Sequence, residues 1–247
     1  MAICRWQALL TRARSVSNMS QPQRAVFTTE CTDCPRLSDF LAQVRINHPD
    51  YFAKPVPPFG DAAPRLLIVG LAPGMHGANR TGRPFTGDHA GVLLYDTLHR
   101  YGFSNQPVSE HSADGLALIG CRITNAVKCL PPENKPETSE IKICNKYLSD
   151  ELKALSENTS VLALGLIAHK AVVMALGLKL SEFPFGHAAE HRLPNGLTLF
   201  DSYHCSRYNT QTRRLTTDMF HAVFARIRNH LQGRESCPTS ISVSPAR

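Results

Sequence analysis

Four short apolar runs along the chain have the length and composition of buried strands. They span residues 66–72, 118–127, 161–166 and 197–204. Continuous apolar runs of this length are typical of strands that are covered on both faces. The pattern therefore predicts a sheet of four buried strands.

Three other segments repeat apolar residues at helical spacing, over residues 91–101, 138–155 and 212–231. Strands that alternate with helices predict an α/β fold with a mainly parallel sheet and helices on both faces. Ligands of such sheets bind beyond the carboxyl ends of the strands. We therefore expect functional residues in the segments that follow each strand.

Composition supports a globular protein, with 43% hydrophobic and 19% charged residues. The formal net charge of +7 favours an anionic partner but does not identify one. No apolar run is long enough to cross a membrane, so we expect no membrane association.

Both ends of the chain differ in composition from the middle. Residues 1–26 contain four arginines and no acidic residue. This composition is typical of a disordered extension or of a targeting signal. It is also typical of an untranslated stretch, in which case translation would start at Met19. Residues 233–247 are rich in Ser and Pro and are expected to form a disordered tail. One domain is predicted over residues 27–232.

Cysteines suggest a metal site. Cys31 and Cys34 form a Cys-x2-Cys-Pro pair, and Cys129 and Cys144 follow far downstream. Closely spaced thiolates can chelate soft metals, but zinc sites usually carry two such pairs. Proline directly after a cysteine occurs in iron–sulfur sequences. The spacing alone leaves zinc, an iron–sulfur cluster and plain free thiols open.

The segment after the first strand, residues 70–88, contains five glycines and is the first candidate site. Glycines let a backbone approach a ligand closely. The loop matches neither common phosphate-binding motif. Phe85 and Asp88 are its candidate functional side chains, although Asp88 could simply cap the next helix. His204, at the end of the last strand, and Asn134, in a proline-bounded loop, are two further candidates.

These motifs together resemble family 5, or type b, of the uracil-DNA glycosylase superfamily. Four motifs occur in the family's order over residues 27–232. They are Cys-x2-Cys-Pro-Arg-Leu at 31–37, the glycine-rich loop with Thr-Gly-Asp at 70–88, Lys-Cys-x-Pro-Pro-x-Asn-Lys-Pro at 128–136, and His204 followed by Arg-x-Asn-Thr. Family 4 carries a catalytic Glu where this chain has Leu71, which favours family 5. Cys205 departs from the family, which has Pro there.

The resemblance implies a three-layer α/β/α sandwich around a four-stranded, mainly parallel sheet. It also implies a structural [4Fe–4S] cluster that ties the N-terminal segment to the loop of Asn134. The implied cluster ligands are Cys31, Cys34, Cys129 and Cys144.

The resemblance further implies a role for each candidate site residue. Asp88 would orient or activate a water molecule, His204 would hydrogen-bond the leaving base, Phe85 would stack on it, and Asn134 would take part in catalysis or base contact. The base-binding backbone would comprise Gly70, Leu71, Ala72, Pro73 and Gly74. We expect the DNA phosphates to be bound by Arg207, Arg213 and Arg214.

The expected activity is removal of uracil, and of other deaminated bases such as hypoxanthine, from double-stranded DNA. No lysine is placed for Schiff-base chemistry, so a monofunctional enzyme that leaves an abasic site is expected. We also expect a monomer in a prokaryotic cytoplasm, where reducing conditions protect the thiols. Three rival hypotheses are an iron–sulfur DNA-binding protein without turnover, a metal-dependent nuclease and a zinc-stabilised binding module.

Overall fold

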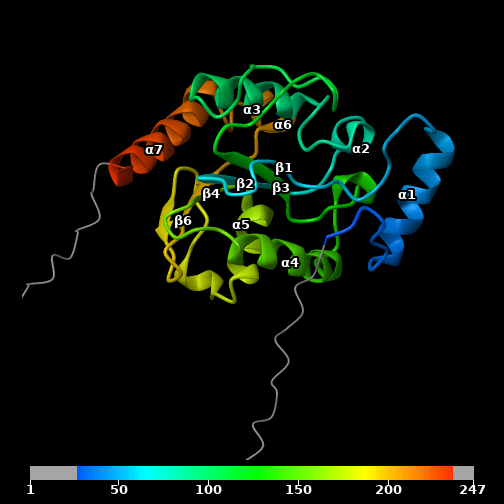
Figure 1. The fold of residues 1–247 in the computed structure, drawn as a ribbon. Coiled ribbons are helices and arrows are strands. Elements are labelled where there is room, and N and C mark those ends of the chain that lie inside the picture. Colours follow the sequence, from blue (N-terminus) through cyan, green and yellow to red (C-terminus); the bar gives the residue numbers. More distant parts are fainter. Residues whose placement is uncertain (1–26, 236–247) are drawn as a thin grey trace, which may run out of the picture.

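The structure is a computed structural model that describes residues 27–235 (Figure 1). Helical segments lie between the strands that match the apolar runs, as the apolar pattern predicts. The strands are β1 (Phe59–Gly60), β2 (Leu66–Gly70), β3 (Cys121–Asn125), β4 (Ser160–Leu164), β5 (Glu190–Arg192) and β6 (Thr198–Ser202). The α-helices are α1 (Pro35–Asn47), α2 (Ala78–Thr81), α3 (His89–Arg100), α4 (Thr138–Lys153), α5 (Leu166–Ala175), α6 (Arg207–Gln211) and α7 (Thr217–Glu235). Two short 3-10 turns, η1 (Pro132–Asn134) and η2 (Leu180–Glu182), complete the described part.

All six strands form one sheet in the order β1-β3-β2-β4-β6-β5. The four inner strands are mutually parallel, and each coincides with part of one of the four apolar runs. The α/β class is thus confirmed, but the expected strand count was too low. Antiparallel β1 and β5 add an edge strand on each side. With two and three residues and half-exposed side chains, these strands carry no apolar run that a sequence pattern could detect.

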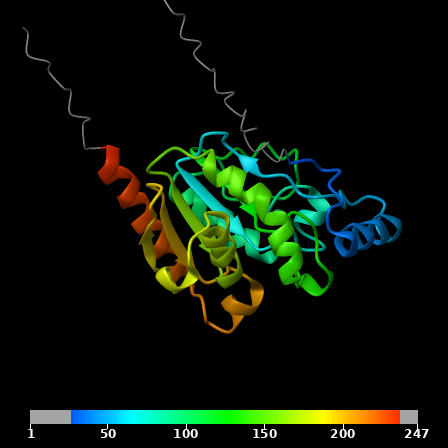
Figure 2. The ribbon, with the colours of Figure 1, turned by 90° about the horizontal axis from the view of Figure 1, so that it is seen from below.

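Successive residues of the inner strands face opposite sides of the sheet, and each face has its own core. Leu66 and Ile68 of β2 pack with α3 and α7, whereas Leu67 and Val69 pack with α4 and α5. Figure 1 shows α3 and α7 on one side of the sheet and α4 and α5 on the other. Figure 2, seen from the side of α4 and α5, shows both helices lying over the strands. The three-layer arrangement therefore follows from alternate burial.

A third, smaller core attaches α1 to the end of the sheet. It joins Leu37, Leu41 and Val44 of α1 to Val127 and to the buried cysteines Cys129 and Cys144. The cysteines that the sequence singles out therefore lie where the N-terminal helix meets the rest of the domain.

Several boundaries differ from the predicted ones. Gly165, at φ +95°, ends β4 early and turns the chain into α5, so the apolar residues that follow are helical. Helix α1 was not predicted, and α7 spans Thr217–Glu235, whereas the apolar stripe predicted a helix over residues 212–231. The predictions for residues 1–26, including Met19, and for the tail beyond 235 lie outside the described residues. Within residues 27–235, no helix is both long and apolar enough to span a bilayer.

Candidate active site

A cavity of about 380 Å³ lies at the carboxyl ends of β2, β3 and β6, where the parallel sheet predicts a ligand site. Its walls come from the loop after β2, the end of β3, the η1 turn and the segment after β6. It is lined by Leu71, Ala72, Gly74, Ala78, Phe85, Asp88, Ala90, Asn125, Asn134, His204 and Ser206. The structure thus brings Phe85, Asp88, Asn134 and His204 together from three distant segments.

Asp88 is both the N-cap of α3 and part of the cavity wall. Its Oδ1 accepts a hydrogen bond from the Gly91 backbone N–H at 2.9 Å. Gly77 leaves room for the carboxylate, because a Cβ there would lie 2.4 Å from Asp88 Oδ2. Burial raises the pKa of Asp88, although the backbone N–H groups of Gly91 and Ala90 oppose the shift. Capping and cavity lining therefore use the same carboxyl group.

Phe85 takes a backbone conformation that a bulky residue rarely adopts, with φ +56°. Two glycines make room for it. A Cβ at Gly91 would lie 1.8 Å from the Phe85 carbonyl oxygen, and one at Gly70 would lie 2.7 Å from the Phe85 ring. The ring stacks with His204 at a centroid distance of 5.9 Å and an interplanar angle of 28°. The two side chains therefore lie against each other in the wall of the cavity.

His204 follows β6 in a loop that side chains stabilise. Its carbonyl oxygen accepts a hydrogen bond from Asn209 Nδ2 at 2.8 Å. Cys205, which replaces the family's proline, is fully buried in the core next to α3 and α7 and is not exposed to oxidants. Burial lowers the pKa of His204 to about 4. At neutral pH the imidazole is therefore uncharged and carries one N–H donor.

This low pKa predicts how the reaction rate and the stability of the fold depend on pH. We expect the reaction rate to show no step from His204 at pH 6.5, the ordinary histidine value, because His204 takes up its proton only toward pH 4. Protonation of Asp88, whose pKa burial raises, lowers the rate on the same acid side. Stability has the same sign, because the unfolded chain takes up the His204 proton first and the folded state weakens as pH falls from 6.5 to 4. Single-turnover rates against pH test this, and a midpoint near 6.5 that disappears in His204→Gln would contradict it.

Asn125, at the end of β3, lines the cavity although no sequence motif pointed to it. It is 3% exposed and lines the cavity, and its Oδ1 has no hydrogen-bond partner among the described residues. It lies beside Gly70, where a Cβ would be 2.4 Å from that oxygen. Buried amide oxygens are rarely left unpaired. A polar residue at the carboxyl end of a buried strand was the signal available in the sequence.

The remaining predicted residues lie at or near the rim. Asn134 is exposed and at φ +57° on η1. Of the predicted backbone segment, Leu71, Ala72 and Gly74 line the cavity, whereas Gly70 lies under Phe85 and Pro73 is buried outside the lining. The three arginines of the predicted phosphate surface are exposed around α6, next to the lining residue Ser206; they are Arg207, Arg213 and Arg214.

The four selected cysteines line one small separate cavity; they are Cys31, Cys34, Cys129 and Cys144. All four are free thiols. Two donors point at their sulfurs. Tyr147 Oη lies 3.3 Å from Cys31 Sγ, and the Lys128 backbone N–H lies 3.4 Å from Cys144 Sγ. Within residues 27–235, no three His, Cys, Asp or Glu side chains stand close enough to hold a single metal ion.

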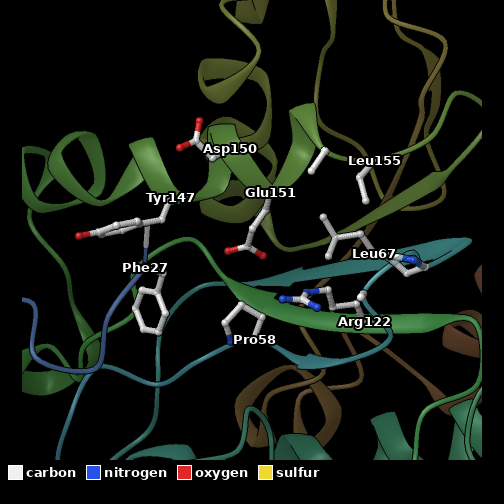
Figure 3. A pocket seen from close by; sticks show the side chains of 11 residues that line it. Phe27, Pro58, Leu67, Arg122, Tyr147, Asp150, Glu151 and Leu155 are labelled. Atoms are coloured by element: carbon white, nitrogen blue, oxygen red, sulfur yellow. The ribbon is translucent and has the colours of Figure 1, made fainter. Parts of the chain in front are cut away.

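A larger cleft of about 460 Å³ lies between α4 and the sheet (Figure 3). It opens beside the starts of β2 and β3, away from the carboxyl ends of the strands. Figure 3 shows the Glu151 carboxylate pointing from α4 toward Pro58 and Arg122. That carboxylate pairs with the buried Lys128 Nζ at 2.6 Å. The larger of these two cavities is therefore not the one at the carboxyl ends of the strands.

Comparison with known proteins agrees with this geometry. The profile described as "Uracil DNA glycosylase superfamily" matches residues 57–228. A type-5 uracil-DNA glycosylase of Thermus thermophilus is 47% identical over 197 residues, which cover 78% of this chain and 90% of that protein. One of Mycobacterium leprae is 41% identical, over 83% and 93%. A type-4 uracil-DNA glycosylase of Pyrobaculum aerophilum is 36% identical over only 51% of this chain. With its sheet-end cavity and this similarity, the chain belongs to the uracil DNA glycosylase superfamily, in the type-5 group.

Proposed function

We propose that the protein is a monofunctional DNA glycosylase that hydrolyses the N-glycosidic bond of uracil in double-stranded DNA. One observation carries the proposal. A cavity at the sheet end that is large enough to admit a nucleobase combines a carboxylate, an uncharged imidazole, an aromatic ring and an unpaired buried amide. The type-5 relatives, named as uracil-DNA glycosylases, support the same activity.

Hydrolysis builds positive charge on the sugar while the base leaves with the bonding electron pair. The oxygen of a water molecule forms a bond to the sugar C1′, and Asp88 orients this water, accepts its proton and stabilises the cationic sugar. The neutral His204 donates its N–H to the departing base and stabilises the negative charge there. A neutral imidazole suits this role because it gains an interaction only as the charge develops.

The base must leave the DNA stack to reach this cavity. Phe85 offers a flat surface for stacking, and the Asn125 amide provides one acceptor and one pair of donors. Uracil presents a donor at N3 and an acceptor at O4, which match an amide. Asn134 is exposed and lines the cavity at its rim, and it would contact the nucleotide at the entrance.

The nature of the side chains in the cavity supports simple hydrolysis. The described residues that line it include no lysine, so no amine is placed to form a Schiff base with the sugar. The buried Lys128 ammonium instead forms an ion pair with Glu151 and donates a hydrogen bond to Thr124. The expected product is therefore an abasic site with an intact backbone. Exposed arginines beyond β6 would bind the phosphates and make DNA binding weaker at high salt.

Release of free uracil from a duplex with a single U·G pair tests this proposal. We expect the wild-type protein to release uracil and to leave DNA that breaks only after alkali treatment. Parallel duplexes with U·A and with hypoxanthine measure the base range. Strand breakage without alkali would contradict the monofunctional mechanism. A folded protein that binds the duplex and releases no base would favour the rival hypothesis of a DNA-binding protein without turnover.

We also propose that Cys31, Cys34, Cys129 and Cys144 bind a [4Fe–4S] cluster. The residues fit this group, since four free thiols from three segments meet in one cavity and two hydrogen-bond donors point at their sulfurs. In such a cluster each thiolate binds its own iron atom, so the four sulfurs need not converge on one point. The cluster would hold α1 against the segment that leads to Asn134.

Replacing Cys144 with serine is expected to remove the cluster. The wild-type protein should purify brown with about four iron atoms per chain, whereas Cys144→Ser should be pale and melt at a lower temperature. Iron and sulfide analysis together with visible absorption measure this. Cys121→Ala is the matched control, because Cys121 is a buried core thiol outside the cysteine cavity. A colourless wild type with one zinc ion would contradict the proposal.

A further inference from the structure

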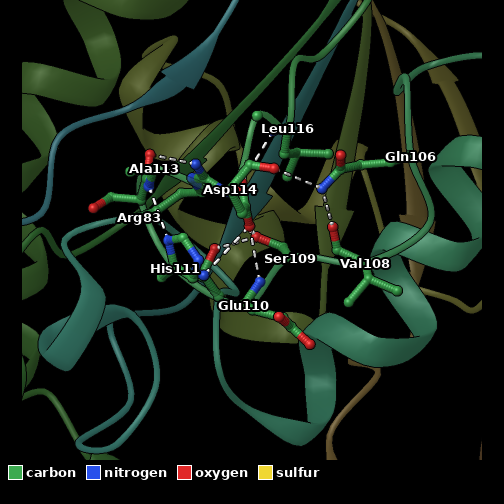
Figure 4. A network of polar contacts seen from close by, with 12 residues as sticks. Arg83, Gln106, Val108, Ser109, Glu110, His111, Ala113, Asp114 and Leu116 are labelled. Atoms are coloured by element: carbon green, nitrogen blue, oxygen red, sulfur yellow. Dashed lines mark hydrogen bonds and ion pairs between the residues drawn. The ribbon is translucent and has the colours of Figure 1, made fainter.

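Arg83 is a buried charged residue that stands two positions before Phe85 but does not line the cavity. It is 5% exposed, and its guanidinium lies 4.6 Å above the Phe59 ring. Nη1 donates to Asp114 Oδ1 at 2.8 Å and to Ser109 Oγ at 3.0 Å, and Nη2 donates to the Ser112 carbonyl at 2.7 Å. One side chain therefore joins the cavity loop to three points of the segment between α3 and β3 (Figure 4).

Asp114 organises the other side of this contact. Its Oδ2 accepts from the backbone N–H of Glu110 at 2.9 Å and of His111 at 3.3 Å, and its Oδ1 accepts from Leu116 N–H at 3.0 Å. Figure 4 shows the segment gathered around this carboxylate. Burial raises the pKa of Asp114, but the Arg83 guanidinium and these N–H groups outweigh it and hold the pKa well below the ordinary value. The pair is therefore ionised.

Two further hydrogen bonds fix the residues on either side of Phe85. Thr86 Oγ1 and Ser109 Oγ lie 2.7 Å apart, so Ser109 contacts both Arg83 and Thr86. Tyr95 Oη donates to the Pro84 carbonyl at 2.7 Å from α3. Arg83, Pro84 and Thr86 are thus all held by residues outside the cavity.

Phe85 needs such support because its own backbone conformation is unfavourable. A bulky residue at φ +56° persists only where the surrounding structure imposes it. The same short segment continues through Thr86 and Gly87 to Asp88, so its shape also determines where the carboxylate stands. We propose that the buried Arg83–Asp114 pair is a positioning unit that holds Phe85 and Asp88 in the geometry required for base release.

This inference rests on the proposed function, because base release is what the geometry serves. Arg83 acts through Phe85 and Asp88 and touches no substrate. Its planar guanidinium reaches Asp114, Ser109 and the Ser112 carbonyl at once, which a lysine ammonium on a single stem cannot do. A lysine at this position keeps the charge opposite Asp114 but loses the geometry.

The test compares single-turnover uracil release by wild type, Arg83→Lys and Ser109→Ala, with enzyme in excess over a U·G duplex. The amplitude reports the folded active fraction, and the rate constant reports the geometry of the assembled site. We expect Arg83→Lys to lower the rate constant by about 10- to 100-fold and Ser109→Ala by about 3-fold, since small displacements of reacting groups cost rates of this order. Affinity for the duplex should stay within about 3-fold, because phosphate contacts dominate it.

Val172→Ala is the matched control. Val172 is fully buried in the core on the α4 and α5 side of the sheet, so its truncation destabilises the fold without contacting the cavity loop. We expect it to lower the melting temperature and leave the rate constant unchanged. If Arg83→Lys and Ser109→Ala behave like Val172→Ala, the pair is only structural and the inference is wrong. If the wild type itself releases no uracil, the proposed function fails first, and the role of the pair in base release fails with it.

Discussion

Replacing Asp88 with asparagine is expected to slow uracil release by about 10²- to 10⁴-fold, the usual contribution of a positioned acid or base. The carboxylate lines the cavity, and in the proposed mechanism it accepts the proton of the attacking water and faces the cationic sugar. An amide has almost the same shape but carries no charge and accepts no proton. Single-turnover release from a U·G duplex measures the effect, with duplex affinity determined separately.

The choice of asparagine separates the two roles of Asp88. Asparagine caps a helix about as well as aspartate, so α3 should begin at the same residue and the melting temperature should change little. Asp88→Ala is the matched comparison, because it loses both the carboxylate and the hydrogen bond from Gly91 N–H. We expect both variants to be slow but only the alanine variant to be destabilised. A fully active Asp88→Asn would reduce Asp88 to a helix cap.

The second large effect is expected at Asn125, where leucine should lower uracil release by about 100-fold or more. A site that hydrogen-bonds a polar base loses transition-state binding when its own polar group is removed. Stability should change in the opposite direction. Asn125 Oδ1 is buried and unpaired, so replacing the amide with an apolar group of similar size removes a desolvation cost. The melting temperature should stay constant or rise while the rate falls.

Asn145→Leu provides the matched control for this prediction. Asn145 is also a buried asparagine, but its Nδ2 donates to the Ala171 carbonyl at 2.9 Å, between α4 and α5. The same substitution there should destabilise the protein and leave the rate constant of release unchanged. If Asn125→Leu proves both destabilised and fully active, the Asn125 amide serves the fold and not base recognition.

The stability changes expected for Asn125→Leu and Asn145→Leu have opposite signs, because only one of the two buried amides is hydrogen-bonded. A paired buried amide stabilises the fold, whereas the unpaired amide at the cavity wall is, in the proposed function, available to the ligand. The strained Phe85 backbone is a second feature of the same cavity that lowers the stability of the fold. Both features lie within one site, and the surrounding packing of α3 and the sheet supports them.

Much of the architecture follows from the sequence alone. The inner strands and the helices α3, α4 and α7 appear as apolar runs and stripes, because each buries one face or both faces in a local, periodic way. Side chains that follow different strands meet at one edge, because the strands of a parallel sheet all end on the same side. That argument is enough to bring Asp88, Asn134 and His204 together at one cavity.

Other features are decided only by the tertiary structure. The edge strands β1 and β5 exist because neighbouring strands provide hydrogen bonds, not because their own residues favour a strand. The unpaired oxygen of Asn125, the lowered pKa of His204 and the pairing of Arg83 with Asp114 each depend on contacts between distant segments. A linear pattern records which residues tend to be buried. It does not record which partners they meet there, and burial with or without a partner determines the charge and chemistry of each group.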